Sequence, residues 1–261
     1  MNGEYLEFAK EIAFKAKEIM LKYYNIDNGS NYKEDNTIVT KADTEINEYL
    51  IKKVKEKFPT HSVDGEEEKF GNSEYIWVCD PVDGTAMYAR HIPTSVFSLA
   101  LVINGEPVVG VIMDPFNDDL YCAQKGLGAY KNNIRISVNS ISLDDMRSVS
   151  HFDMFPTFEY NIFDAVEELA KKTYFISIGS IARACTCVAS GELNVAIFPG
   201  TKHKHCDMAA AKIIVEEAGG IVTDLFGSSQ EYNTDIRGAV ISNGKVHQEV
   251  LDSLRKYTKL M

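Results

Sequence analysis

Two β-rich runs, at residues 96–103 and 108–113, flank the dipeptide Asn104-Gly105. Asn-Gly between two such runs is a strong signal of a β-hairpin. Further strands are expected at residues 120–123 and 129–138, joined by glycine turns. The first half of the chain is therefore expected to contain an antiparallel sheet.

Helical periodicity precedes this sheet. Apolar residues recur at three- and four-residue steps from Tyr5 to Tyr23, and a second apolar face runs from Ala42 to Lys57. Both segments are predicted to be amphipathic helices, the second of which stops at Phe58-Pro59. A polar loop containing Gly65 and a short apolar strand at residues 75–79 are expected next.

In the second half of the chain, predicted strands and helices alternate. Strands are expected near Val149 and at 174–178, 193–198 and 238–242, and helices at 163–171, 181–189, 208–218 and 246–257. Because no repeat or obvious linker separates them, two interlocked halves are predicted, residues 1–140 and 141–261. The expected fold is an α/β (α+β) layered sandwich with alternating helix and sheet layers, antiparallel in the first half and mixed in the second.

Composition restricts the partners and the compartment. The 261 residues include 38 acidic and 27 basic ones, and the formal charge of -11 would repel nucleic acid. No apolar run is long enough to cross a bilayer, and residues 1–10 lack the layout of a secretion signal, so a cytoplasmic protein without a membrane partner is expected. The five scattered cysteines are interpreted as reduced thiols, mostly buried.

The most informative stretch runs from Trp77 to Thr85, where an apolar strand ends in two aspartates, a proline and a Gly-Thr pair. Asp80 and Asp83 could converge with the Val82 carbonyl on one point, and such hard oxygen ligands suit Mg²⁺. A capped turn explains a bare DxxDG pattern equally well. Phosphatases with an aspartyl nucleophile carry that aspartate where Pro81 stands here, so covalent aspartyl-phosphate chemistry is disfavoured.

Two other acidic features lie elsewhere in the chain. Asp64 and the run Glu66 to Glu68 surround Gly65, and Asp207 opens the helix predicted at residues 208–218. Taken singly, the first is most simply a solvated charged loop and the second a helix N-cap. They become informative only in combination with the two aspartates after Trp77.

Together these motifs resemble the inositol monophosphatase family, within the wider group of Mg²⁺-dependent, lithium-sensitive phosphatases. The family's G-E-E matches Gly65 to Glu67, and its D-P-[IVL]-D-G-T matches Asp80 to Thr85. Its W-D-x-A-[AG]…E-A-G-G matches Cys206 to Gly220, with Cys206 in place of Trp, and its V-T-x-x-D matches Val39 to Asp43. The resemblance covers nearly the whole chain and is specific for the superfamily rather than for a substrate.

The resemblance implies a phosphatase that hydrolyses a small phosphate monoester by direct attack of metal-activated water. Two or three Mg²⁺ ions would bridge the phosphate of a small metabolite. Packing the metal-binding carboxylates together without cations would be strongly repulsive. The residues implied as ligands are Glu66, Asp80, the Val82 carbonyl, Asp83 and Asp207.

The resemblance also implies roles around the reacting phosphate. Thr85 would orient the water and help to deprotonate it, with Asp43 hydrogen-bonded to the Thr85 hydroxyl and Glu67 nearby. Backbone amides of Gly84 and Thr85 would bind phosphate oxygens. Residues 33–40 resemble the loop that closes on the metal site, and a homodimer is the expectation for the family.

One departure from the family pattern concerns the substrate. Relatives that act on inositol phosphate carry an acid before the last motif, whereas residues 196–200 contain none and a basic patch follows at residues 201–205. Lys202 and Lys204 of this patch, with Arg183, are therefore candidate substrate-binding residues. Such cations suit a substrate with more negative charge than a monophosphate.

Two further features have alternative explanations. Arg90 and His91 lie in a loop that departs from the family pattern, where they could meet a second anionic group or remain solvated. The cluster of His203, His205 and Cys206 could indicate zinc, but no second ligand pair in the sequence completes such a site.

Inositol monophosphate is the default substrate for the family. The alternatives are a sugar bisphosphatase acting on fructose 1,6-bisphosphate and a 3'(2'),5'-bisphosphate nucleotidase. A rival from another class is a non-catalytic sensor of a phosphorylated metabolite. The presence of every metal-binding residue type argues against that rival.

Overall fold

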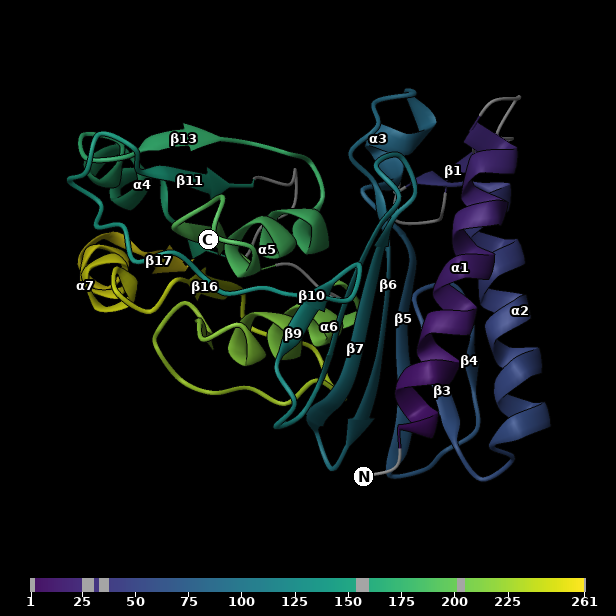
Figure 1. Cartoon of the computed structure of the whole chain (residues 1–261). Coiled ribbons are helices and arrows are strands. Elements are labelled where there is room, and N and C mark those ends of the chain that lie inside the picture. Colours follow the sequence, from purple (N-terminus) through teal and green to yellow (C-terminus); the bar gives the residue numbers. More distant parts are fainter. Residues whose placement is uncertain (1–2, 25–30, 33–37, 154–159, 201–204, 261) are drawn as a thin grey trace.

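The computed structural model of the chain describes residues 3–24, 31–32, 38–153, 160–200 and 205–260 (Figure 1). These segments stack as alternating layers of helices and sheets, so the predicted layered sandwich is confirmed. Among these residues no helix combines the length and the apolar character needed to span a bilayer.

The larger sheet has eight strands in the order β10-β9-β8-β7-β6-β5-β3-β4. Neighbouring strands run antiparallel except β3 and β5, which run parallel. The strands are β3 (Ser62–Gly65), β4 (Lys69–Phe70), β5 (Tyr75–Asp83), β6 (Val96–Ile103), β7 (Glu106–Asp114), β8 (Asp119–Gln124), β9 (Ala129–Lys131) and β10 (Ile134–Arg135).

Two local predictions in this sheet are wrong. The residues leading to Gly65 form a strand, with Gly65 opposite Cys79 of β5, rather than a polar loop. The strand predicted at residues 129–138 is a short hairpin instead, because Asn132 and Asn133 have φ angles of 49° and 66° and so reverse the chain. The predicted hairpin at Asn104-Gly105 is confirmed.

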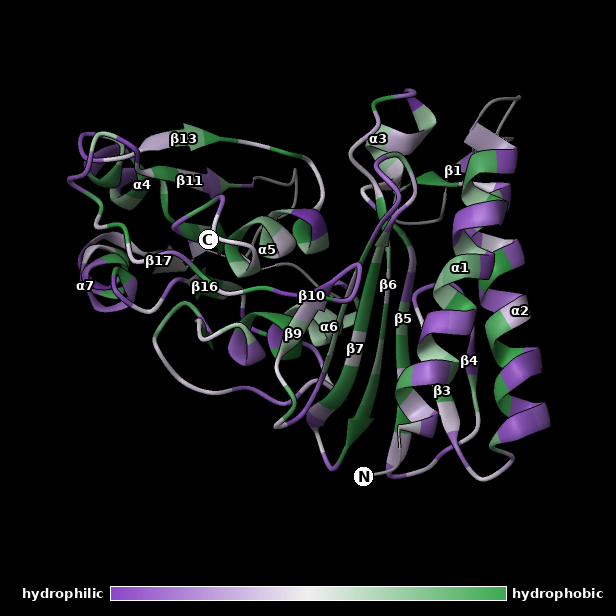
Figure 2. Cartoon of the chain, viewed as in Figure 1, coloured by the Kyte–Doolittle hydropathy of each residue, from purple (hydrophilic) through white to green (hydrophobic). Residues whose placement is uncertain are grey.

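Both faces of the large sheet are covered by helices. On one face lie α1 (Glu4–Tyr24) and α2 (Lys41–Lys57), whose outer sides are hydrophilic (Figure 2). On the other face lie α5 (Ile181–Ala189) and α6 (His205–Glu217). Along β6, odd-numbered residues such as Leu99 pack with the first helix pair and even-numbered ones such as Ala100 with the second. A sheet buried on both sides explains why β6 and β7 read as continuous apolar runs.

The smaller sheet is mixed and has the order β13-β11-β14-β16-β15. Strand β11 runs parallel to both its neighbours, and the remaining pairs are antiparallel. Helices α4 and α7 cover its outer face, and α5 and α6 lie between the two sheets. The elements are β11 (Val149–Phe152), β13 (Tyr174–Ile176), β14 (Val195–Phe198), β15 (Ile221–Thr223), β16 (Ala239–Ser242), α4 (Phe163–Leu169) and α7 (His247–Tyr257).

Two short strand pairs and one short helix complete the described chain. Strand β1 (Asn31–Tyr32) pairs with β2 (Ile38–Val39), and β12 (Tyr160–Asn161) pairs with β17 (Lys259–Leu260). The short helix α3 (Thr85–Ala89), which the sequence did not indicate, follows β5 directly.

Helix α6 lies at the centre of the molecule. Its residues from His205 to Val215 are all buried, because sheets pack against it from both sides. A helix of the second half thus packs on the sheet of the first, although a domain division near residue 140 stays a prediction. The five cysteines are free and buried, as predicted.

Candidate active site

The end of β5 brings two aspartates together. Residues three apart on a regular strand point to opposite faces, but the register against β6 shifts between Asp80 and Asp83. The Val82 amide donates a hydrogen bond to Asp80 Oδ1 at 3.0 Å within this irregularity. The broken register lets both carboxylates reach one point, as the DxxDG pattern predicted.

Helix α5 holds the second aspartate from the other half of the molecule. The Ser180 hydroxyl and the Ala182 amide, at 2.7 Å, both donate to Asp83 Oδ2. A carboxylate is favoured there, because the amides at a helix N-terminus carry partial positive charge. Sequence reasoning missed Ser180 in this role; its position just before a predicted helix signalled a cap, but nothing signalled a partner 97 residues away.

Asp207 completes an acidic cluster with Asp80 and Asp83. Carboxylate oxygens of the three residues lie within 4.8 Å of one another, and the residues are only 1 to 4% exposed. Buried carboxylates this close repel one another unless a cation or a proton is shared among them. A set of hard oxygen donors fits a divalent metal ion. Asp207 is not the predicted N-cap, because α6 already begins at His205.

Three further acids lie around this cluster. Glu66 and Glu67 are half-buried just after β3, and the Glu66 amide donates to the Cys79 carbonyl at 3.1 Å, beside Asp80. Asp43 on α2 is fully buried. Burial raises the pKa of Asp43 to about 7; hydrogen bonds from Thr40 oppose this rise, and the charges of Glu66 and Glu67 add to it. The acidic motifs therefore converge in space.

Asn47 is a positioning residue that the sequence analysis missed. It lies one helical turn after Asp43 on α2 and donates to the Glu68 carbonyl at 3.2 Å. A side chain on Gly65 would lie 1.9 Å from Asn47 Oδ1, so only glycine allows this approach. The available signal was a pair of polar residues, Asp43 and Asn47, at helical spacing on an otherwise apolar face.

The Gly84-Thr85 pair adopts a geometry that differs in part from the expectation. The Thr85 hydroxyl donates to the Val82 carbonyl at 2.9 Å, and Asp43 accepts hydrogen bonds from Thr40. Among the described residues, the predicted hydrogen bond between Asp43 and Thr85 is therefore not formed. Gly84 has a φ of 85°, and its Cα faces the Gly179 carbonyl, so the DGT turn lies directly against the start of α5.

The predicted substrate-binding residues have different outcomes. Lys202 and Lys204 lie outside the described residues, as do residues 33–37 of the predicted closing loop. The guanidinium of Arg183 contacts Asp114 at 3.4 Å and donates to the Tyr121 hydroxyl at 3.1 Å. Its charge is thus already paired beside the end of β7.

The loop that carries Arg90 and His91 is exposed. Arg90 donates to the Ala86 carbonyl at 3.1 Å, and the His91 ring packs edge-on against Tyr24, with ring centroids 5.2 Å apart. These contacts match the solvated-loop explanation more closely than a substrate contact.

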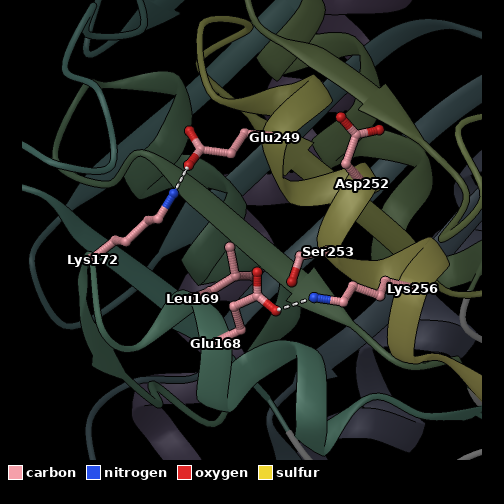
Figure 3. A pocket seen from close by; sticks show the side chains of 7 residues that line it. All are labelled: Glu168, Leu169, Lys172, Glu249, Asp252, Ser253 and Lys256. Carbon is pink, nitrogen blue, oxygen red and sulfur yellow. Dashed lines mark hydrogen bonds and ion pairs between the residues drawn. The ribbon is translucent and has the colours of Figure 1, made fainter.

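A surface hollow between α4 and α7 contains none of the acidic residues described above (Figure 3). Four of its charged side chains pair with one another, Lys172 with Glu249 and Lys256 with Glu168. The hollow lies in the outer helix layer, so the chemistry is expected at the acidic cluster instead.

A buried cluster of carboxylates that could hold a metal ion, at the end of a central strand of a layered α/β fold, fits a metal-dependent phosphatase. The model of the inositol monophosphatase family matches residues 1–259, and the chain belongs to this family. The protein is therefore an enzyme that hydrolyses a phosphate monoester, which favours catalysis over the sensor alternative.

Relatives and solved structures agree with this assignment. The chain is 32% identical over 255 residues to a Thermotoga maritima protein named fructose-1,6-bisphosphatase/inositol-1-monophosphatase, covering 94% of each. It is 33% identical over 228 residues to a Synechocystis inositol-1-monophosphatase, covering 83% of this chain and 76% of the relative. A solved Thermotoga maritima inositol monophosphatase superposes with a TM-score of 0.86 at 27% identity over 97% of both chains.

Proposed function

We propose that the protein is a Mg²⁺-dependent inositol monophosphatase-like enzyme in which water attacks the phosphorus directly. The observation that carries this proposal is the buried cluster of Asp80, Asp83 and Asp207, built from both halves of the chain. Glu66 and the Val82 carbonyl complete the proposed ligand set. Bound Mg²⁺, as two or three ions, would supply Lewis-acid charge for the phosphate and the leaving oxygen.

The remaining site residues are proposed to orient the water and the phosphate. Thr85 would hold the attacking water, and Gly84 and Thr85 would offer backbone amides to phosphate oxygens. Asp43 and Glu67 lie in the acidic surroundings, and a carboxyl group with a pKa near 7, as for Asp43, can accept a proton at neutral pH. These roles follow the positions of the family motifs in this sequence.

A second candidate substrate is fructose 1,6-bisphosphate. The specific support is the name of the Thermotoga maritima relative, which covers both activities. Lys202, Lys204 and Arg183 are the proposed contacts for a second phosphate. If they bind it, their replacement should reduce activity on fructose 1,6-bisphosphate or adenosine 3',5'-bisphosphate more than activity on inositol 1-phosphate.

Phosphate release from these substrates, with Mg²⁺, with a chelator and with added Li⁺, tests the proposal. Asp80→Asn is expected to reduce turnover at least about 100-fold, because several kcal/mol of charge stabilisation are lost and each 1.4 kcal/mol is tenfold. The amide oxygen can still accept the hydrogen bond from Val82. Asp119→Asn is the matched control, since Asp119 on β8 pairs with Lys131 on β9 instead of joining the acidic cluster.

The outcomes separate the explanations. Loss of activity in Asp80→Asn with a normal Asp119→Asn supports the metal mechanism. Equal turnover by Asp80→Asn and the parent contradicts it. Activity that persists in the chelator would contradict the requirement for Mg²⁺.

The proposed state is a homodimer in the cytoplasm. Tyr174 and Ile176 are exposed on β13, an edge strand of the smaller sheet, where a second copy could cover them. Five free cysteines suit a reducing compartment. Light scattering on the purified protein, with Tyr174→Lys as the comparison, tests the dimer.

A further inference from the structure

A second cluster of metal-ligating side chains lies beside the acidic one. Asp64 is near the end of β3, and His205 and Cys206 open α6. One ligand atom from each lies within 4.8 Å of the other two. The sequence showed the His-Cys pair but not its completion, because Asp64 is 141 residues away from His205.

The distances in this cluster match those of a tetrahedral zinc site. Zinc, bound at about 2.0–2.1 Å by nitrogen or oxygen and about 2.3 Å by sulfur, holds its ligand atoms roughly 3.3–3.6 Å apart. Here His205 Nε2 lies 3.2 Å from Asp64 Oδ2 and 3.6 Å from Cys206 Sγ. Two of the three separations thus already match those that the ion requires, and the third lies within 4.8 Å.

Burial and the surrounding charges point to the same conclusion. His205 and Cys206 are 3% and 2% exposed, and within the described part of the chain His205 Nδ1 has no hydrogen-bond partner. That nitrogen faces the Asp235 carboxylate at 3.6 Å. A metal-bound histidine usually directs its other ring nitrogen at a carboxylate in this way, which fixes the ring and strengthens the ligand.

We propose that Asp64, His205 and Cys206 form a zinc site with one open coordination position, separate from the oxygen-only cluster at Asp80. Sulfur and imidazole ligands select zinc over magnesium, whereas an all-carboxylate site suits magnesium. Two adjacent sites of different donor chemistry therefore divide the two metals between them.

Lys69 is the competing cation. Its ammonium contacts Asp64 Oδ1 at 2.8 Å, while Oδ2 is the oxygen that faces His205. The Lys69 side chain is 66% exposed, so it can stay on Oδ1 or turn into solvent without blocking the ligand oxygen. On zinc binding, the Cys206 thiol would release its proton to solvent.

Zinc at this position would join the two halves of the molecule. Asp64 lies two residues before Glu66, and Cys206 directly precedes Asp207. The bound ion would connect the end of β3 to the first turn of α6. Zinc is therefore expected to raise the melting temperature even when magnesium already fills the acidic cluster.

Cobalt(II) is the direct probe, since it takes the same ligands and shows a near-ultraviolet charge-transfer band only when a thiolate binds it. The full chain is titrated with Co²⁺ and then Zn²⁺ in excess Mg²⁺, which occupies the oxygen cluster. The parent is expected to show the band and lose it as Zn²⁺ displaces Co²⁺. Cys206→Ala should lack the band and bind zinc at least about tenfold more weakly.

Cys185→Ala is the matched control, because this buried thiol lies within the electrostatic reach of Asp83 and Asp207. It should keep the band. Asp64→Asn, a change at a less buried position, should weaken zinc binding while the folded protein keeps its melting temperature in Mg²⁺, and it serves if Cys206→Ala does not fold.

The proposal is overturned if the parent shows no band, if the band survives in Cys206→Ala, or if Asp64→Asn binds zinc as tightly as the parent does. These readouts do not use turnover. A failure of the zinc site is therefore distinguishable from a failure of the proposed phosphatase mechanism.

Discussion

Replacing Gly84 with alanine should disturb the contact between the DGT turn and α5. The added Cβ would lie 2.8 Å from the Gly179 carbonyl oxygen, 3.2 Å from Ser180 Cβ and 3.3 Å from Ser95 Oγ. A separation below 3.0 Å from a backbone atom forces a shift. The segment that must move carries Ser180, which holds Asp83 in place.

The magnitude has two parts. A non-glycine residue at positive φ lowers the free energy of unfolding by about 1–2 kcal/mol, of which about 0.4–1 kcal/mol is offset because the unfolded chain is less flexible. Overpacking against a fixed backbone adds about 1–3 kcal/mol. Gly84→Ala is therefore expected to lower the free energy of unfolding by about 2–4 kcal/mol. For a chain of this size this corresponds to a fall of roughly 5–15 °C in melting temperature.

Gly126 provides a matched control. Its φ is 81°, close to the 85° of Gly84, but a Cβ there would meet nothing within 4 Å. Gly126→Ala should thus show the conformational loss alone, about 1 kcal/mol or less. Urea unfolding with Mg²⁺ present measures both variants, and turnover should fall strongly only in Gly84→Ala.

Equal stability losses in the two alanine variants would refute the reasoning, because the close approach to α5 would then contribute nothing. Full turnover in a destabilised Gly84→Ala would also refute it in part. That result would mean that the position of Asp83 does not depend on the contact.

Three other predictions concern two single contacts and the binding of divalent cations. Burial lowers the pKa of His61 below 6.5, and its Nδ1 accepts a hydrogen bond from Trp77. The contribution of His61 to stability is therefore complete above pH 6.5 and is lost as the pH falls. In urea unfolding, the free energy of unfolding should depend less on pH in His61→Phe. Glu217 accepts hydrogen bonds from the Gly126 and Gly128 amides at 2.6 and 2.7 Å. Glu217→Gln should therefore lower the free energy of unfolding by about 1–3 kcal/mol, and Glu216→Gln, a change at an exposed residue, should lower it less. Chelation of divalent cations should lower the melting temperature of the parent. A cation at 100 times its Kd adds about 2.7 kcal/mol to the free energy of unfolding, and this added stability should be smaller in Asp207→Asn.

Features that depend on neighbours in sequence were predictable. The Asn104-Gly105 hairpin and the two N-terminal helices follow from turn chemistry and apolar spacing, and all are present. The aspartates after Trp77 were predicted as candidate ligands because a strand end, a proline and a Gly-Thr turn stand together in the chain. Their convergence is visible in the structure.

Features that depend on distant contacts were not predictable. β3 contains Asp64 and Gly65, which have low strand propensity, and it forms because β5 offers a parallel partner. The hydrogen bond from Ser180 to Asp83 and the contact between Asp64 and His205 join residues 97 and 141 positions apart. Only the packing of two sheets around α6 brings such residues together.

The central position of α6 has a consequence for the order of folding. A helix whose residues from His205 to Val215 are all buried cannot be stable until both sheets are in place, so we expect it to dock late. On this order of folding, Asp207, which lies beside Asp80 and Asp83 in the folded chain, would reach them only at that step. A newly made chain would then have no complete ion site until α6 docks between the sheets. Tight metal uptake during refolding would therefore report this last docking step rather than the initial hydrophobic collapse of the chain.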